Sequence, residues 1–159
     1  MFKNVVQLAY VTTDLERAVS VFRDDQGVRE FATFDSLQRP TVGGGEAVIN
    51  WGLTYVGDLQ LEIIQPVSGE VDVYRALLPE RSDQFVLRSH HIASQLDSTD
   101  EYDAVMAGYR QRGHRIALEA SFGGTRFFYA DTYDLLGHFQ EYLLIDDATK
   151  EWLATLPRN

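Results

Sequence analysis

The 159-residue chain is long enough to bury the core of one domain, and its 45% hydrophobic and 12% aromatic residues are typical of a globular protein. A net charge of -10 and only two lysines, Lys3 and Lys150, disfavour binding to a phosphate backbone. The sequence contains no cysteine, so any metal must be held by His, carboxylate or amide groups rather than by thiolates.

No apolar run approaches the roughly 20 residues needed to cross a bilayer. The first residues carry one lysine and then a strand-like segment, without the apolar region and cleavage site of a secretory signal. We therefore expect a cytoplasmic protein that has no nucleic-acid or membrane partner.

The first half of the chain predicts one helix among four strands. An apolar strand over 5–11 is followed by Asp14, a good helix N-cap, and Gly27 stands where a helix C-terminal glycine belongs. Between them, apolar side chains recur at the spacing of an amphipathic helix: Leu15, Ala18, Val19 and Phe22. The three further strands are expected over 29–34, 47–56 and 59–65, and Pro66 ends the last of them.

The second half of the chain repeats this order. A strand over 89–94 precedes Ser98-Thr99-Asp100-Glu101, a capping box that begins a second amphipathic helix, and Gly113 ends that helix. Strands are then expected over 115–119, 125–130 and 138–144.

The repeat predicts an α+β fold of two βαβββ modules. A single domain over 1–159 would contain module 1 over about 4–66, a connection over 67–88, module 2 over about 89–145 and a C-terminal tail over 146–159. The connection has a helix-like segment around 73–78, and the tail predicts a short helix over 147–156.

Each module places polar residues on an apolar face of its first and last strands. They are Gln7, Glu62, His91 and Glu141. Burying an unpaired carboxylate costs several kcal/mol, and these four strands contain no Lys or Arg. A divalent cation would neutralise Glu62 and Glu141, while His91 and the Gln7 carbonyl would complete a mixed nitrogen and oxygen site.

These residues also have plainer interpretations. A satisfied core amide at Gln7, a hydrogen-bonded core histidine at His91, and glutamates that face solvent at strand ends would explain them without a metal. The symmetric placement of all four in the two modules favours the metal site.

Four segments resemble the vicinal oxygen chelate superfamily, which includes glyoxalases, methylmalonyl-CoA epimerases, bleomycin-resistance proteins and extradiol dioxygenases. The segments are VVQLAYVTTDLERAVSVF (5–22), GDLQLEIIQP (57–66), SHHIAS (89–94) and YADTYDLLGHFQEYL (129–143), and the resemblance spans about 4–145. It implies that the two modules form a curved, partly open barrel around a metal site. Carried over by motif, the metal ligands are Gln7, Glu62, His91 and Glu141. The resemblance also implies a homodimer.

The ligand types favour proton transfer over oxygen chemistry. Gln7 and Glu62 depart from the His, His, Glu set of extradiol dioxygenases, whereas the whole set resembles that of zinc-type glyoxalase I. The sequences of the segments HHIA, LEIIQP and GHFQEYL resemble those of the methylmalonyl-CoA epimerase and glyoxalase-like group. The implied function is a metal-dependent glyoxalase-like lyase or isomerase that transfers a proton at a carbon next to a carbonyl through a metal-bound enediolate. By the same resemblance Glu141 is the general base, and Glu62 is the weaker catalytic candidate.

The expected cofactor is one divalent metal ion, which the sequence leaves open among zinc, nickel, cobalt, manganese and iron. The substrate is expected to be a small molecule with vicinal oxygens. The low lysine count gives little reason to expect a clamp for CoA phosphates. The alternative function is a non-enzymatic, ligand-sequestering protein of the bleomycin-resistance type, which has no need for the four ligands.

Other polar residues are interpreted without a catalytic role. His90 and His138 alternate away from the predicted ligands, and His90 is expected to face the surface or a helix. The glycines at 43–45 lack a following Lys-Ser/Thr and predict a flexible loop. Glu46 is expected to be solvated, and Arg126 is either an anchor for an anionic substrate or a surface charge.

Overall fold

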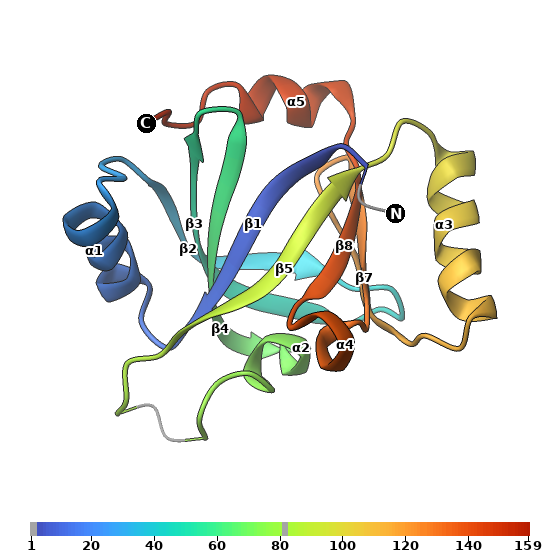
Figure 1. The fold of residues 1–159 in the computed structure, drawn as a ribbon, viewed down its shortest axis with the longest axis horizontal. Coiled ribbons are helices and arrows are strands. Elements are labelled where there is room, and N and C mark those ends of the chain that lie inside the picture. Colours follow the sequence, from blue (N-terminus) through green and yellow to red (C-terminus); the bar gives the residue numbers. More distant parts are fainter. Residues whose placement is uncertain (1–2, 81–82) are drawn as a thin grey trace.

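A computed structural model describes residues 3–80 and 83–159 of the chain, which form a curved sheet with helices around it (Figure 1). The strands are β1 Val5–Thr12, β2 Ala32–Pro40, β3 Glu46–Val56, β4 Leu59–Gly69, β5 Leu87–Gln95, β6 Ile116–Phe122, β7 Thr125–Ala130 and β8 Phe139–Leu144. The helices are α1 Leu15–Gln26, α2 Asp72–Arg75, α3 Thr99–Gln111, α4 Tyr133–Leu136 and α5 Asp147–Leu153.

The eight strands form one mixed sheet in the order β2-β3-β4-β1-β5-β8-β7-β6. The first and last strands of each module are parallel neighbours, β1 with β4 and β5 with β8, and the modules join through the antiparallel pair of β1 and β5. The predicted repeat of two βαβββ modules is therefore confirmed, with the short helix α4 added between β7 and β8.

Local signals set the ends of both long helices as predicted. The Asp14 side chain accepts a hydrogen bond from the Arg17 backbone N–H, and Gly27 ends α1 with φ of 73°. In module 2 the Ser98 side chain accepts from the Glu101 backbone N–H. These caps fix where each helix leaves its strand, and hence which strand residues face the interior.

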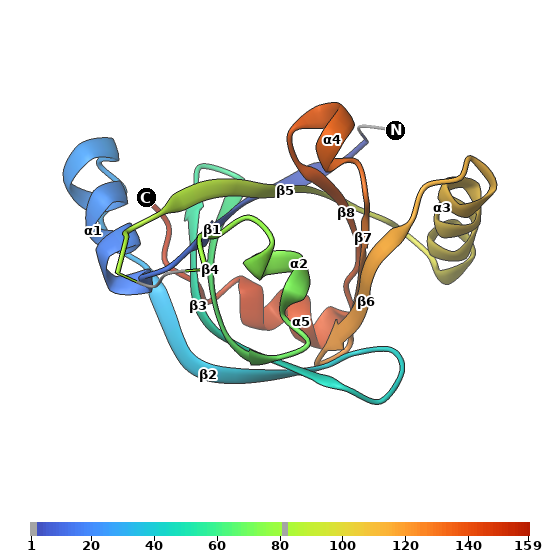
Figure 2. The ribbon, with the colours of Figure 1, turned by 90° about the horizontal axis from the view of Figure 1, so that it is seen from below.

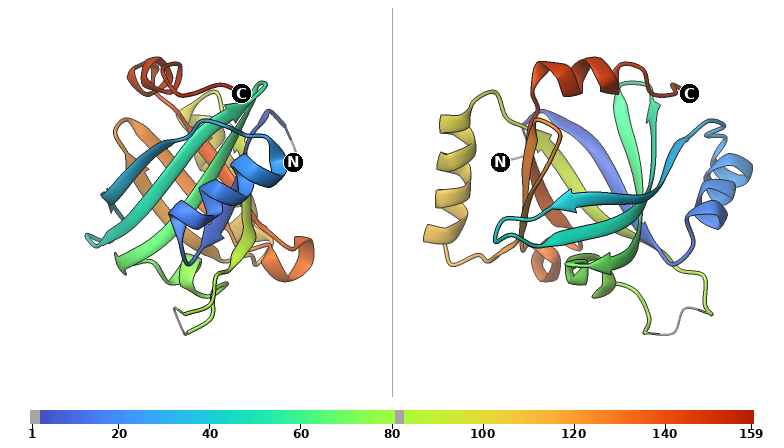
Figure 3. Two further views of the ribbon diagram at one scale, coloured as in Figure 1. Left: turned by 90° about the vertical axis from the view of Figure 1, so that its left-hand side faces the viewer. Right: turned by 180° about the vertical axis from the view of Figure 1, so that it is seen from behind.

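The sheet curls until its two edges approach each other (Figure 2). The Val42 backbone N–H, just after β2, donates to the Glu119 carbonyl of β6 at 2.9 Å, and Thr41 pairs with Ala120. Helices α1 and α3 lie outside the barrel on opposite sides, α5 crosses one end, and α2 lies at the other (Figures 1 and 3). The barrel interior is thus enclosed from most directions.

Three strand predictions were wrong in their bounds, and one of them is β6, which was expected over 115–119 and continues to Phe122. β2 begins at Ala32 and runs to Pro40, later and longer than predicted, and β4 continues past Pro66 to Gly69. Pro66 is tolerated because the pairing of β4 with β1 has already ended and the β3 side carries a bulge there, so the ladder needs no N–H from proline.

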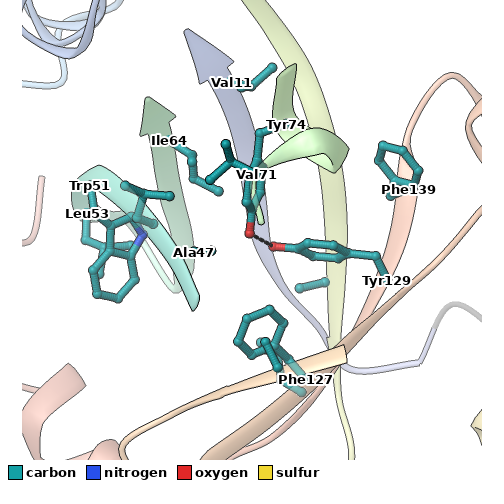
Figure 4. Packing of buried hydrophobic residues seen from close by; sticks show 14 of the residues in the cluster. Val11, Ala47, Trp51, Leu53, Ile64, Val71, Tyr74, Phe127, Tyr129 and Phe139 are labelled. Carbon is teal, nitrogen blue, oxygen red and sulfur yellow. Dashed lines mark hydrogen bonds between the residues drawn. The ribbon is translucent and has the colours of Figure 1, made fainter. Parts of the chain in front are cut away.

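The main core fills the barrel interior (Figure 4). It combines aliphatic side chains such as Leu53 and Ile64 with Tyr74, Phe127 and Tyr129. Separate apolar clusters lie under α3 and α1. Among the described residues, no helix is long and apolar enough to span a membrane.

Candidate functional site

The strand registers place the four predicted ligands in two equivalent pairs. Ala9 of β1 pairs with Glu62 of β4, and Ala93 of β5 pairs with Glu141 of β8. Gln7 and His91 each stand two residues before that alanine, on the same face of the strand. The small alanines leave room for the longer side chains around them. The symmetry seen in the sequence is therefore a symmetry of the fold.

All four side chains meet inside the barrel. Their exposed fractions are 5% for Gln7, 3% for Glu62, 0% for His91 and 3% for Glu141. The glutamates do not face solvent, so that interpretation is excluded. His91 Nε2 lies 3.1 Å from Gln7 Oε1, 3.1 Å from Glu62 Oε2 and 2.9 Å from Glu141 Oε2. Three acceptor oxygens thus converge on a single nitrogen.

His90 fixes the tautomer of His91. His91 pairs with Ala9 and Ser89 with Tyr10, so His90 is an extra residue at a bulge, which breaks the alternation of β5. Of the two places expected for His90, the surface is wrong: His90 is buried and packs against Tyr74 of helix α2. It also lies beside His91, not on the opposite face.

The hydrogen bonds of the two rings follow from their partners. His90 Nε2 lies 3.3 Å from the Val73 carbonyl, which only accepts, so this nitrogen carries the proton. His90 Nδ1 is then an acceptor and receives the N–H of His91 Nδ1 at 2.7 Å. His91 Nε2 is left with a lone pair that faces three acceptors. A cation must sit at this nitrogen, either as a proton or as a metal ion.

One proton does not satisfy the three oxygens. A single N–H on His91 Nε2 points along one direction only. Gln7 Oε1 lies where it can accept a hydrogen bond from this nitrogen. Glu141 Oε2 is buried without a hydrogen-bond partner even though it lies 2.9 Å from His91 Nε2. Glu62 does have a hydrogen-bond donor, because the Trp51 indole N–H donates to its Oε1 at 2.5 Å.

The site separates the pKa values of its two carboxyl groups. Burial alone would raise the pKa of Glu62, but hydrogen bonding and attraction from His91, with Arg39 nearby, lower it overall. Burial raises the pKa of Glu141 and the neighbouring Glu62 charge adds to this, against a smaller opposing effect of His91. Burial lowers the pKa of His91, yet the two carboxylates outweigh it and raise that pKa to about 9.

Sequence reasoning missed Arg39 of β2. Its side chain is buried, its Nη2 lies 3.9 Å from Glu62 Oε1, and its guanidinium lies over the Trp51 ring. The expectation of a site without Lys or Arg considered only the ligand strands. β2 lies two strands from β4 in the sheet, and no sequence pattern around Arg39 signals that the side chain is buried beside Glu62. Gln60, which accepts a hydrogen bond from Gln7 Nε2 at 2.6 Å, shares a strand face with Glu62 and was predictable.

A cavity of about 50 Å³ adjoins the site and touches Gln7, Glu62 and Glu141. Its walls combine aromatic side chains with aliphatic and polar ones, and helix α5 supplies part of them. The wall includes Arg39, Trp51, Phe122, Phe127 and Trp152.

The residues that were set aside lie elsewhere. Arg126 is 43% exposed in its side chain and lies near Asp103 and Glu119, as a surface charge does. Glu46 is exposed, as expected. His138 Nδ1 contacts the Leu136 carbonyl at 3.1 Å, so it contributes to a local turn.

The sequence matches no family model, and no curated protein matches it. Solved structures do. A variant of Streptomyces coelicolor methylmalonyl-CoA epimerase in complex with 2-nitronate-propionyl-CoA superposes with a TM-score of 0.61 at 18% identity, covering 92% of this chain and 97% of that one. The chain has the vicinal oxygen chelate fold.

Two further structures with this fold match over similar lengths. The Mycobacterium tuberculosis methylmalonyl-CoA epimerase has a TM-score of 0.52 at 14% identity and covers 95% of both chains. The hypothetical protein BH1468 from Bacillus halodurans has a TM-score of 0.54 at 11% identity, covering 92% of this chain and 97% of that one. At such identities the likeness concerns the fold, so function must be argued from the site.

The donor set of this vicinal oxygen chelate barrel suits a divalent cation. An imidazole nitrogen, two carboxylates and an amide oxygen are ligands that zinc and other transition metals accept. The unpartnered Glu141 Oε2 is a buried oxygen that a cation would satisfy. As they stand, no three or more His, Asp or Glu side chains within 3–80 and 83–159 are arranged to hold a metal ion. The carboxylates lie at hydrogen-bond distance from the imidazole instead. The residues fit a metal chemically, and the metal itself stays a prediction.

Proposed function

We propose that this protein is a metal-dependent isomerase or lyase that moves a proton at a carbon next to a carbonyl group. The observation that carries the proposal is the convergence of three buried acceptor oxygens on His91 Nε2. Gln7, Glu62, His91 and Glu141 would hold one divalent ion, such as zinc, nickel, cobalt, manganese or iron. When bound, such an ion polarises substrate oxygens and stabilises developing negative charge by several kcal/mol.

The two carboxylates differ in a way that assigns their roles. Glu62 accepts from the Trp51 indole, and its pKa is lowered, so it stays ionised and fixed. Glu141 Oε2 has no hydrogen-bond partner, and its pKa is raised, mainly by burial. Carboxylates whose environments push their pKa values apart commonly divide acid-base work between them. Glu141 is therefore the proton-transferring group, and Glu62 is the weaker candidate.

The surroundings keep bulk water from this proton transfer. Trp51, Phe122 and Trp152 line the cavity next to Glu141, and Trp152 is contributed by α5, which crosses the barrel end. Limited access of bulk water strengthens the electrostatic interactions that stabilise negative charge developing on the substrate. The proton held on Glu141 still exchanges with solvent between abstraction and return, so the reaction incorporates solvent hydrogen at the carbon.

A second function is favoured by one observation. Protonated His91 alone, with its pKa raised to about 9, provides a positive charge between the two carboxylates without any metal. The protein would then sequester a ligand in the cavity, as a bleomycin-resistance type protein does. Such a protein exchanges no substrate proton.

Solvent deuterium exchange tests the enzyme proposal. The metal-replete protein is incubated in D₂O with 2-methylmalonyl-CoA, the glutathione hemithioacetal of methylglyoxal, and small 2-oxo and 2-hydroxy acids. We expect exchange at the carbon beside the carbonyl for one of these classes, lost in Glu141→Gln and retained in Glu46→Gln, whose parent residue is exposed. Undiminished exchange in Glu141→Gln would refute the assigned base. No exchange with any substrate would favour the binding protein.

A further inference from the structure

We infer that Arg39 binds a carboxylate of the substrate, so that the substrate class is one whose reacting carbon lies beside a carboxylate. This inference rests on the proposed function and narrows it. It begins from a buried cation that the proton-transfer chemistry does not use.

Two neighbouring N–H donors of the Arg39 guanidinium have no hydrogen-bond partners. The residue is 5% exposed, and its Nε and Nη2 are both buried without a hydrogen bond. These two N–H groups lie side by side on one edge of a guanidinium, where they match the two oxygens of a carboxylate. Arg39 also lines the cavity together with Glu62 and Glu141. Its two free donors are themselves buried, so a small movement of the guanidinium is needed to bring this edge to a molecule in the cavity.

Neighbouring groups hold Arg39 without satisfying it. Its Cζ lies 4.2 Å from the centre of the Trp51 ring and 5.3 Å from that of Phe122. Such stacking covers a face of the guanidinium and leaves its edge unpaired. Glu62 Oε1 lies 3.9 Å from Nη2, beyond hydrogen-bond distance, and already accepts from Trp51. Arg39 is therefore positioned in advance and lacks an acceptor.

The charges of the site call for one more anion. A bound divalent cation would be balanced by Glu62 and Glu141 together, and Arg39, whose Nη2 lies 3.9 Å from Glu62, would then have no counter-ion of its own. A buried charge without a partner is strongly unfavourable, and a substrate carboxylate would supply the missing negative charge. A neutral substrate would leave Arg39 unpaired.

Size and distance limit what carries this carboxylate. The cavity of about 50 Å³ accommodates only a compact reacting end. Because Arg39 lies close to Glu62, the carboxylate of the substrate must be within one or two bonds of the substrate oxygens that face the predicted metal ligands. 2-Hydroxy acids, 2-oxo acids and malonate-type half-esters meet both conditions. A hemithioacetal, which has no carboxylate at its reacting end, does not.

Tryptophan fluorescence of the full-length, zinc-loaded protein tests the inference. The chain's two tryptophans, Trp51 and Trp152, both line the cavity. The probes are lactate, pyruvate and methylmalonate, with lactamide and pyruvamide as neutral counterparts. We expect at least one acid to bind at least tenfold more tightly than the neutral counterparts. Equal binding of acids and amides, or no binding of any acid, would overturn the inference.

Variants of Arg39 separate a binding role from a structural one. Arg39→Met, which keeps the length of the side chain, should weaken acid binding at least tenfold while amide binding and zinc content stay unchanged, and Arg39→Lys should recover part of the acid affinity. Arg126→Met is the matched control on an exposed arginine and should bind like the parent. If Arg39→Met does not fold, the parent and Arg39→Lys still decide. Parental acid binding by a folded Arg39→Met would overturn the inference.

The two proposals fail differently. Carboxylate binding through Arg39 with no deuterium exchange would leave this inference intact and remove the proton-transfer function. Exchange confined to the hemithioacetal would keep the function and remove the carboxylate subsite.

Discussion

Replacing Trp152 by alanine should both destabilise the protein and open its cavity. Trp152 is the aromatic residue through which α5 packs on the barrel end. Its ring lies 5.9 Å from Trp51, 5.8 Å from Phe34 and 5.9 Å from Phe122. Each aromatic pair of this kind contributes about 0.5 to 1.5 kcal/mol, so losing all three should cost about 1.5 to 4.5 kcal/mol. The lost wall also exposes Trp51.

Two assays check this prediction. Urea denaturation should show the lower free energy of unfolding, and iodide should quench the remaining Trp51 in folded Trp152→Ala more strongly than it quenches the parent. Glu151→Ala, a neighbouring exposed position on α5, is the control and should behave like the parent. Unchanged stability together with unchanged quenching would show that α5 does not cover the cavity, and the argument for a dry site would fail.

Three further predictions concern the ligands and the cap of α5. Glu141→Gln removes one of two buried negative charges and should weaken zinc binding by about 3 kcal/mol, roughly 100-fold, in a calorimetric titration; equal affinity would refute its role as a ligand. Gln60→Leu deprives Gln7 Nε2 of its acceptor and should weaken zinc binding roughly tenfold, whereas an unchanged affinity would mean that Gln60 does not orient Gln7. The hydroxyl and backbone N–H of Thr149 lower the pKa of Asp146, the N-cap residue of α5. The stability that this cap contributes is therefore fully present above the unfolded-state pKa of about 3.9, and it is lost as the pH falls through the lower pKa of the folded state. Trp152 fluorescence should therefore change with acid in the parent and less in Asp146→Asn, and identical acid titrations would contradict this.

Much of the fold was predictable because its signals are local. Asp14 and Ser98 cap their helices through their own side chains, and Gly27 ends α1 with a backbone shape that glycine favours. The four ligands were also predictable, since alternation along a strand fixes which side chains share a face. Their symmetric registers followed from the repeat of the modules.

What sequence reasoning missed depends on contacts between distant segments or on broken regularity. The bulge at His90 puts two adjacent residues inside the barrel, against the alternation that predicts opposite faces. Arg39 comes from β2, an edge strand two places from β4, and it joins the site because the sheet curls and its side chain is buried inside the barrel. The cover supplied by α5 depends on where the tail leads after β8. None of these features leaves a periodic signal in the sequence.

The metal content of the purified protein shows whether Gln7, Glu62, His91 and Glu141 form a metal site. Elemental analysis is run on the parent, on Glu62→Ala and on His91→Ala after identical exposure to divalent metals and removal of free ions. We expect about one divalent ion per chain in the parent and none in either variant, since each variant loses one ligand of the buried cluster. Equal metal in all three proteins would contradict this expectation.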